Sequence, residues 1–145
     1  MVKIPFGLSD EGLQRLLYGL TKQYPRPTSV LREYVTNGVD EAIEIPNGQV
    51  TVLLDPQNRR ILIQDNAPGL NMSEVQQLPD KVGDSAKKGK PNKRGEKGIG
   101  LLAFGSIGNR VHFITKRKEY TKYNYMRYEI DYYNERLENA DVDEI

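Results

Sequence analysis

The chain has 145 residues, of which 37% are apolar and 28% charged, and these values are typical of a globular domain that buries one core. No apolar run approaches the roughly 18 residues that span a bilayer, and the first residues lack the apolar segment of a signal peptide, so we expect a cytoplasmic protein without a membrane partner. The absence of cysteine excludes disulfides, thiol catalysis and Cys-ligated zinc, and the single histidine excludes a multi-histidine metal site. Any bound metal ion would need oxygen ligands.

The net charge of +1 conceals a strong segregation of charge along the chain. Residues 81–97 carry seven Lys or Arg against two Asp or Glu, whereas residues 135–145 carry five acidic residues against one Arg. A basic segment attracts the phosphates of a nucleotide or of a nucleic acid. Charge alone does not distinguish that role from a solvated loop, and both interpretations stay open.

Two helices are predicted in the first third of the chain. Ser9, followed by two acidic residues and then by leucines at helical spacing, predicts an N-capped amphipathic helix that ends before Tyr24. Two prolines then predict an extended connection. A second helix is expected to begin at Thr28 or Ser29 and to continue to about Ile45, ahead of a Pro-Asn-Gly turn.

The remaining elements are mostly strands. Residues 49–55 and 60–65 are rich in β-branched residues and predict a hairpin, and residues 110–116 and 123–133 predict another. A short helix is expected from Ser73 and a very apolar one over residues 99–107. Residues 79–98 have no apolar periodicity, which is typical of a mobile lid or of disorder.

Some aromatic residues admit a simple structural interpretation. His112 lies in an apolar strand pattern and is expected to be a structural histidine. Six tyrosines between Tyr120 and Tyr133 lie among Lys and Arg, so they could stack on single-stranded bases, or they could pack on the strand.

A polar stripe runs along the second predicted helix. With about 100° per residue, Glu33, Asn37 and Asp40 lie on one side of this helix, which is either its solvent-exposed side or a ligand site. Gly38 in mid-helix costs about 1 kcal/mol relative to Ala, so a demand other than helix propensity favours it. An Asn amide oxygen suits magnesium, and a Glu one turn earlier could reach a water molecule beside the same ion.

Two further segments could contact a nucleotide. Asp65 ends an apolar strand, where its carboxylate could accept a hydrogen bond from an exocyclic amino group, and Gly69 would let a flat base approach the backbone. An Asp-Asn turn is the simpler interpretation. Gly95, Gly98 and Gly100 precede an apolar helix, so their amides could bind phosphate or merely cap that helix. The spacing fits neither a dinucleotide fold nor a Walker A loop.

Taken in order, residues 33–40, 65–69 and 95–100 resemble the N, G1 and G2 boxes of the GHKL ATPases, which include DNA gyrase B, the ninety-kilodalton heat-shock chaperone, MutL and the histidine kinases. The resemblance implies one α+β domain over residues 1–145 with the Bergerat fold, a two-layer sandwich in which helices cover one face of a mixed sheet. ATP would lie between helices and sheet under a mobile lid formed by residues 79–98.

The resemblance also implies residue roles. Glu33 corresponds to the base that orients the hydrolytic water, Asn37 to the magnesium ligand and Asp40 to a further acidic position. Asp65 corresponds to the adenine-reading aspartate and Gly69 to the glycine beside the base. The implied phosphate loop comprises Gly95, Lys97, Gly98, Ile99, Gly100 and Leu101.

The details of the boxes refine this expectation. Histidine kinases usually lack the glutamate found here as Glu33, so the chain is more similar to the chaperone, MutL and MORC-type branches. Ala67 replaces the first G1 glycine, and no Gly-Thr strand follows the last predicted hairpin before Ile145. Either the chain is a fragment, truncated at the C-terminal edge of the sheet, or those strands have been lost.

The expected function is magnesium-dependent ATP binding with slow hydrolysis to ADP and phosphate. The nucleotide state would act as a conformational switch for association with a further domain or protein, including a nucleotide-dependent dimer. Two alternatives stay open. One is a nucleotide-gated interaction module without significant hydrolysis, and the other is a nucleic-acid-binding module that uses the basic segment and the tyrosines.

Overall fold

A computed structural model describes residues 1–88, 100–132, 136–137 and 139–145, with side chains for all of these except 81–88. The helices are α1 (Asp10–Gln23), α2 (Pro27–Ala42), α3 (Met72–Lys88) and the short 3₁₀ helix η1 (Ala103–Ser106). The strands are β1 (Val2–Ile4), β2 (Val50–Asp55), β3 (Arg60–Asp65), β4 (Arg110–Thr115), β5 (Asn124–Asp131), β6 (Arg136–Leu137) and β7 (Ala140–Glu144).

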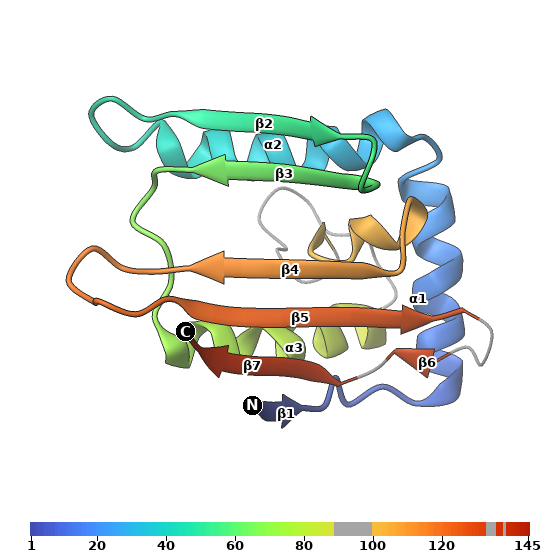
Figure 1. The fold of residues 1–145 in the computed structure, drawn as a ribbon. Helices are drawn as coiled ribbons and strands as arrows, with labels where there is room; N and C mark the ends of the chain where they lie inside the picture. Colours follow the sequence, from blue (N-terminus) through green and yellow to red (C-terminus); the bar gives the residue numbers. More distant parts are fainter. Residues whose placement is uncertain (89–99, 133–135, 138) are drawn as a thin grey trace.

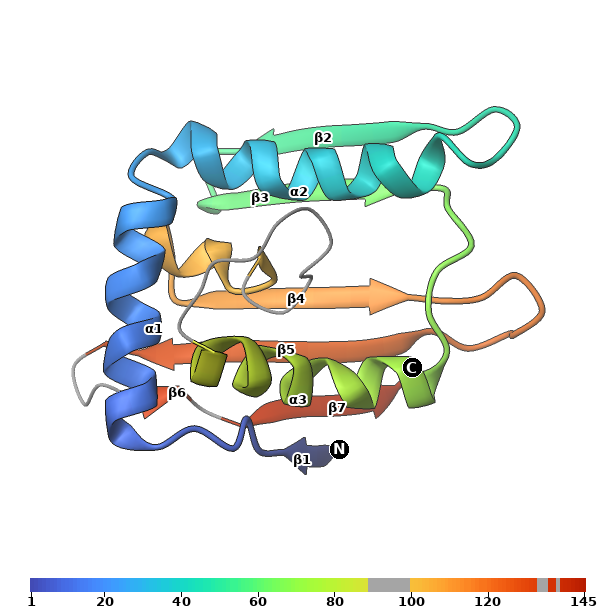
Figure 2. The same cartoon turned by 180° about the vertical axis from the view of Figure 1, so that it is seen from behind.

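The molecule has two layers, with α1, α2 and α3 all on one face of the strands (Figures 1 and 2). One sheet has the strand order β1-β7-β5-β4 with β6 on β5, and β2 and β3 form a separate antiparallel hairpin. Strands β3 and β4 run side by side in the same direction, and no ladder joins them among the described residues (Figure 1). The predicted α+β class with helices on one face is confirmed.

Helix α1 forms as its sequence predicts. The backbone N–H of Gly12 donates to Ser9 Oγ over 3.1 Å, which caps the helix, and Leu13, Leu16 and Leu20 are buried. The helix ends where the N–H of Tyr24 donates to the Leu20 carbonyl. None of the helices in the described residues is long and apolar enough to cross a membrane.

Helix α2 begins and ends slightly earlier than expected. It starts at Pro27 instead of Thr28 or Ser29, because proline at the first helical position has a preset φ and needs no N–H partner. It ends at Ala42 rather than near Ile45, since Pro46 disfavours a helical conformation in the residue before it.

Helix α3 is longer than the sequence suggested. Its cap is Asn71, not Ser73: Glu74 N donates to Asn71 Oδ1 and Asn71 N donates to Glu74 Oε2, a reciprocal capping box. The helix continues past Pro79, which is fully buried, so the irregular segment expected from residue 79 is helical as far as Lys88. Residues 89–98 lie outside the described part of the chain, and the lid stays a prediction.

The apolar segment before β4 is not one α-helix. Instead of the continuous helix expected over residues 99–107, the described part has a helical residue at Gly100, a turn at Leu101 and Leu102, and then η1. The cause is a side chain from α2. Phe104 N donates to Tyr34 Oη, and Tyr34 Oη donates to the Leu101 carbonyl, so two backbone groups that an α-helix would use internally are already engaged.

Both predicted hairpins are confirmed, with Leu53 opposite Leu62 in one and Phe113 opposite Met126 in the other. Alternate β5 residues are buried beneath the helices, where Tyr128 packs edge-on against Phe6 and Phe113. Strands β1, β6 and β7 were not predicted from the sequence. Strand β7 lies between β5 and β1, and Val142 pairs with Met126 on one side and Val2 on the other.

Candidate functional site

Helix α2 lies against the β2-β3 hairpin at Gly38. A Cβ atom at this position would lie 3.3 Å from Val50 Cγ2 and 3.7 Å from Asp65 Cβ. Glycine therefore lets the helix backbone lie against the hairpin, which is a structural reason for its presence in mid-helix. Asn37, the residue before Gly38, is half-buried, while Asp40 is exposed.

The loop after Asp65 is held by polar side chains. Ala67 N donates to Asp65 Oδ1 over 3.0 Å, and Asp65 Oδ2 forms no hydrogen bond within the described part of the chain. The Asn66 side chain accepts from Gln49 N over 2.7 Å and donates to the Asn47 carbonyl over 2.9 Å. These hydrogen bonds hold the loop around Asp65 in place. Asp65 itself keeps one exposed carboxylate oxygen available to a ligand.

The loop is anchored again at Leu70. Its N–H donates to Thr115 Oγ1 over 2.9 Å, and its carbonyl accepts from Asn124 Nδ2 over 2.9 Å. Gly69 has φ of +74°, and a Cβ atom there would lie under 3.0 Å from the Lys116 carbonyl. Gly69 is thus required for packing against the end of β4, and its predicted contact with a base stays a prediction.

We expect Gly69→Ala to destabilise the fold by about 2 kcal/mol or more. The left-handed conformation costs a non-glycine residue about 1–2 kcal/mol, and the methyl group would also displace the Lys116 backbone. Urea unfolding measures the change. Gly19→Ala is the matched control: it adds a methyl group with nothing within 4 Å in α1 and should raise stability by up to about 1 kcal/mol. A Gly69→Ala variant as stable as the original chain would contradict this account.

The carboxylate of Glu33 lies against Gly100. Glu33 is half-buried on α2, and a Cβ atom on the buried Gly100 would lie well under 3.0 Å from Glu33 Oε1. Any larger residue at position 100 would therefore displace the carboxylate. Leu101, the next residue, is tied to α2 because its carbonyl accepts from Tyr34 Oη over 2.9 Å. The first predicted segment thus meets the end of the third.

The other members of the predicted phosphate loop are Gly95, Lys97, Gly98 and Ile99, and they lie outside the described residues. The structure consequently brings together Glu33 with Gly100, and Gly38 of α2 with Asp65. Residues of the second and third sequence segments thus both contact helix α2, which carries the first segment.

Four residues of this site escaped the sequence analysis: Tyr24, Tyr34, Thr115 and Asn124. Burial, together with the charge of Glu33, raises the pKa of Tyr24. Burial also raises the pKa of Tyr34. Both tyrosines resembled ordinary core residues in the sequence. Asn124 gave the one usable signal, because it is a polar residue in phase with the buried face of β5.

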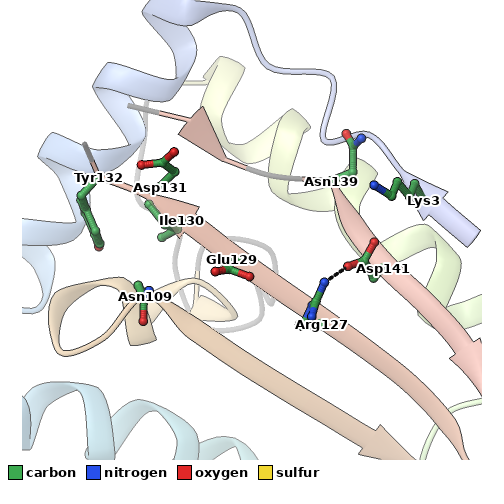
Figure 3. A pocket seen from close by; sticks show the side chains of 9 residues that line it. All are labelled: Lys3, Asn109, Arg127, Glu129, Ile130, Asp131, Tyr132, Asn139 and Asp141. Atoms are coloured by element: carbon green, nitrogen blue, oxygen red, sulfur yellow. Dashed lines mark hydrogen bonds and ion pairs between the residues drawn. The ribbon is translucent and has the colours of Figure 1, made fainter. Parts of the chain in front are cut away.

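A cavity of about 500 Å³ lies elsewhere, near the ends of β5 and β7 (Figure 3). Lys3, Arg127, Glu129 and Asp141 line it, and Arg127 and Asp141 form an ion pair there. Residues Arg127 and Glu129 alternate with the buried residues of β5 and so face away from the helices. This cavity is distinct from the Glu33 and Asp65 cluster.

The side chains that could bind a metal ion do not cluster among the described residues. No three His, Cys, Asp or Glu side chains converge anywhere in residues 1–80 or in the described residues after position 99. A magnesium ion at the α2 site would thus rely on Asn37 and on oxygens supplied by a nucleotide and water, which is how magnesium is commonly held beside phosphates.

Comparison with known proteins identifies the family. A search of curated proteins finds no match to this chain. A family model described as "Histidine kinase-, DNA gyrase B-, and HSP90-like ATPase" matches residues 25–144, a span that contains all three segments, α2, α3 and the strands β2 to β7. The chain therefore belongs to the histidine kinase-, DNA gyrase B- and HSP90-like ATPase family, whose domains bind ATP.

Proposed function

We propose that this chain hydrolyses ATP slowly to ADP and phosphate, with magnesium, in a site centred on α2. The observation that carries the proposal is the pair of contacts along α2: Glu33 lies against Gly100, and Gly38 lies against Asp65. Residues of three separate sequence segments thereby face one region, as a single nucleotide site requires.

The adenine would bind at the β3 end of the site. Asp65 Oδ2 is free within the described residues and can accept a hydrogen bond from the exocyclic amino group of adenine. Gly69 would border the base. Guanine carries a carbonyl oxygen at the corresponding position, which a carboxylate repels, so Asp65 would select adenine.

The phosphates would bind near Gly100, where the backbone is free of a side chain. The proposed loop comprises Gly95, Lys97, Gly98, Ile99, Gly100 and Leu101, and residues 79–98 would form a lid over it. Asn37 would hold magnesium through its amide oxygen, with Asp40 as a further acidic group nearby. The donors fit this ion, since amide and carboxylate oxygens are hard ligands, and magnesium when bound neutralises phosphate charge.

Glu33 would act as the general base. Its carboxylate would accept a hydrogen bond from a water molecule and take up a proton as the water oxygen attacks the γ-phosphorus in line with the departing ADP. The backbone beside Gly100 would donate to the phosphate oxygens. The half-buried setting of Glu33 favours this role, because few competing water molecules can reach it.

We further propose that the nucleotide state controls association with another domain or protein, including a second copy, in the cytoplasm. The presence of Glu33 in the first segment favours the chaperone, MutL and MORC-type branches over histidine kinases. A module that binds nucleotide without hydrolysis is the alternative, and the two differ in one measurable product, inorganic phosphate.

Titration calorimetry with ATP, in the presence and absence of magnesium, tests the proposal together with a phosphate-release assay. We expect saturable binding that magnesium strengthens, and slow release of phosphate. Binding without phosphate release would favour the gated module. No binding of ATP under either condition would reject the proposed function.

We expect Gly100→Ala to lower turnover at least tenfold, with a smaller effect on ATP affinity. The added methyl group would occupy the space of Glu33 Oε1 and push the carboxylate aside, whereas Asp65 at the other end of the site would be unchanged. Steady-state phosphate release and calorimetry separate the two effects. Gly108→Ala is a suitable control, because its nearest contact would be an ordinary 3.9 Å. Unchanged turnover in Gly100→Ala would contradict the placement of Glu33.

A further inference from the structure

Strand β2 forms an open edge of the molecule. It is the outermost strand at the top of Figure 1, and among the described residues it pairs only with β3. Proteins commonly protect such an edge with lysine, proline, a bulge or a very short strand. The edge strand β1 has two of these features, because it is three residues long and contains Lys3. Strand β2 contains neither lysine nor proline, and its six residues pair with β3 without a break, so its outer edge is free to pair with another strand.

Neither face of the middle of β2 is covered. Val50 packs near Gly38 of α2, but Val52 and Leu54 on the same face are 45% and 59% exposed. Leu53 on the opposite face is 57% exposed. An antiparallel sheet that meets water ordinarily buries one face and alternates apolar with polar residues. Three consecutive exposed apolar residues on an unprotected edge are typical of a surface that another chain covers.

The hydrogen bonds at the start of the hairpin show which backbone groups of β2 point outwards. Gln49 N donates to Asn66 Oδ1 over 2.7 Å, and the Gln49 carbonyl accepts from Asn66 N over 3.3 Å, so both backbone groups of Gln49 face β3. These directions alternate along an antiparallel strand. The N–H and carbonyl groups of Val50, Val52 and Leu54 therefore point away from β3, towards the open edge.

We propose that two copies of the chain pair through β2, antiparallel and about a two-fold axis at Val52. In an antiparallel ladder, residues whose backbone groups point outwards must lie opposite residues of the same kind. The register that pairs all the outward residues of β2 places Val52 opposite its own copy and Val50 opposite Leu54. The same surface then serves both partners, as a two-fold interface requires, and the hairpins join into one continuous sheet.

The charges at the two ends of the hairpin fit this orientation. The segment that leads from α2 into β2 has the exposed acids Asp40 and Glu44 nearby, whereas the tip of the hairpin has the exposed Arg59 and Arg60. Arg60 pairs with Asp55 over 3.0 Å, and Arg59 forms no ion pair in the described part of the chain. Antiparallel pairing brings the basic tip of one copy beside the acidic end of the other. Parallel pairing would bring like charges together, so the charges favour the antiparallel dimer.

Sedimentation equilibrium of the chain without nucleotide tests the proposal. We expect a reversible dimer with a dissociation constant in roughly the micromolar range, because an interface built on one strand is small. Val52→Lys and Val52→Glu each place like charges directly opposite at the axis and should weaken the dimer at least about tenfold. An equal mixture of the two variants should form a heterodimer, since opposite charges then meet at the axis.

Leu62→Lys is the matched control. Leu62 belongs to the same hairpin and is 53% exposed, but it lies on β3, away from the open edge, so this variant should dimerise as the original chain does. Thermal unfolding should show that all three variants fold, because each changes an exposed side chain.

Each contrary outcome overturns a stated part of the proposal. An original chain that stays monomeric up to about 1 mM overturns the dimer and leaves the edge to a strand of another protein. A dimer that survives both Val52 variants but not Leu62→Lys is formed by the face of the hairpin, which overturns pairing through the edge. Monomeric Val52 variants that fail to associate when mixed overturn the axis at Val52. No nucleotide enters these measurements, so their failure leaves the proposed ATP site intact, and failure of ATP binding leaves the dimer intact.

Discussion

Replacing Glu33 by alanine is expected to reduce ATP hydrolysis by about 10²- to 10⁴-fold, the usual contribution of a general base. ATP affinity should change by no more than a few-fold, because the proposed contacts to adenine and phosphate involve Asp65 and the backbone near Gly100. A loss of turnover with retained binding is the signature of a group that acts on the attacking water rather than on the bound nucleotide.

Single-turnover phosphate release measures the rate and calorimetry measures the affinity of Glu33→Ala. Glu41→Ala is the matched control, since Glu41 is an exposed glutamate on the same helix. It should retain full turnover and full affinity. Retained hydrolysis in Glu33→Ala would remove Glu33 from the mechanism.

For Asp65→Asn we expect ATP affinity to fall about 10- to 100-fold, because a hydrogen bond to a charged acceptor contributes about 1.5–3 kcal/mol. The substitution is nearly isosteric, and the amide oxygen can still accept the bond from Ala67 N, so the loop should keep its shape. The discrimination between ATP and GTP should weaken at the same time.

Calorimetry with both nucleotides tests this expectation. Asp55→Asn provides the control at the far end of the same hairpin, where the carboxylate accepts hydrogen bonds from Asn58 and Arg60. This control should bind ATP as the original chain does. If Asp65→Asn binds ATP with undiminished affinity, Asp65 does not read the base.

The elements that the sequence predicted well are those with local causes. Ser9 caps α1 through the N–H of Gly12, three residues further on. The alternation in β4 and β5, with only residues 116–123 between them, favours a hairpin without help from the rest of the chain. In these segments the determining interactions lie within a few residues, where sequence patterns report them directly.

The predictions were wrong or incomplete where residues far apart in the sequence determine the local structure. Tyr34 engages the backbone at Leu101 and Phe104, nearly seventy positions away, and this prevents the expected α-helix. Pro79 is accommodated inside α3 because its ring is buried in the core. Strand β1 pairs with β7, so its partner lies at the other end of the chain. Neither strand pairing nor burial of this kind can be predicted from a short stretch of sequence.

The residues of the candidate site show the same difference between local and distant causes. Gly38 drew attention as a poor helix former, and the structure explains it by the close approach of Val50 and Asp65. Glu33 and Gly100 were assigned to one site from motif order, and they lie in contact. Tyr34 could not be found this way, because an aromatic residue in a helix resembles any core residue until the partners of its hydroxyl group are known.

Within the part of the chain that the structure describes, no ladder joins β3 to β4, and this has a mechanical consequence. Helix α2 and the β2-β3 hairpin carry Glu33 and Asp65 on one block, and the Tyr34 hydroxyl group joins this block to the neighbouring one, which carries Gly100 and the Leu70 anchor. A slide of one block past the other would shift both carboxylates by the same amount. The affinity for the nucleotide and the alignment of the attacking water would then change together.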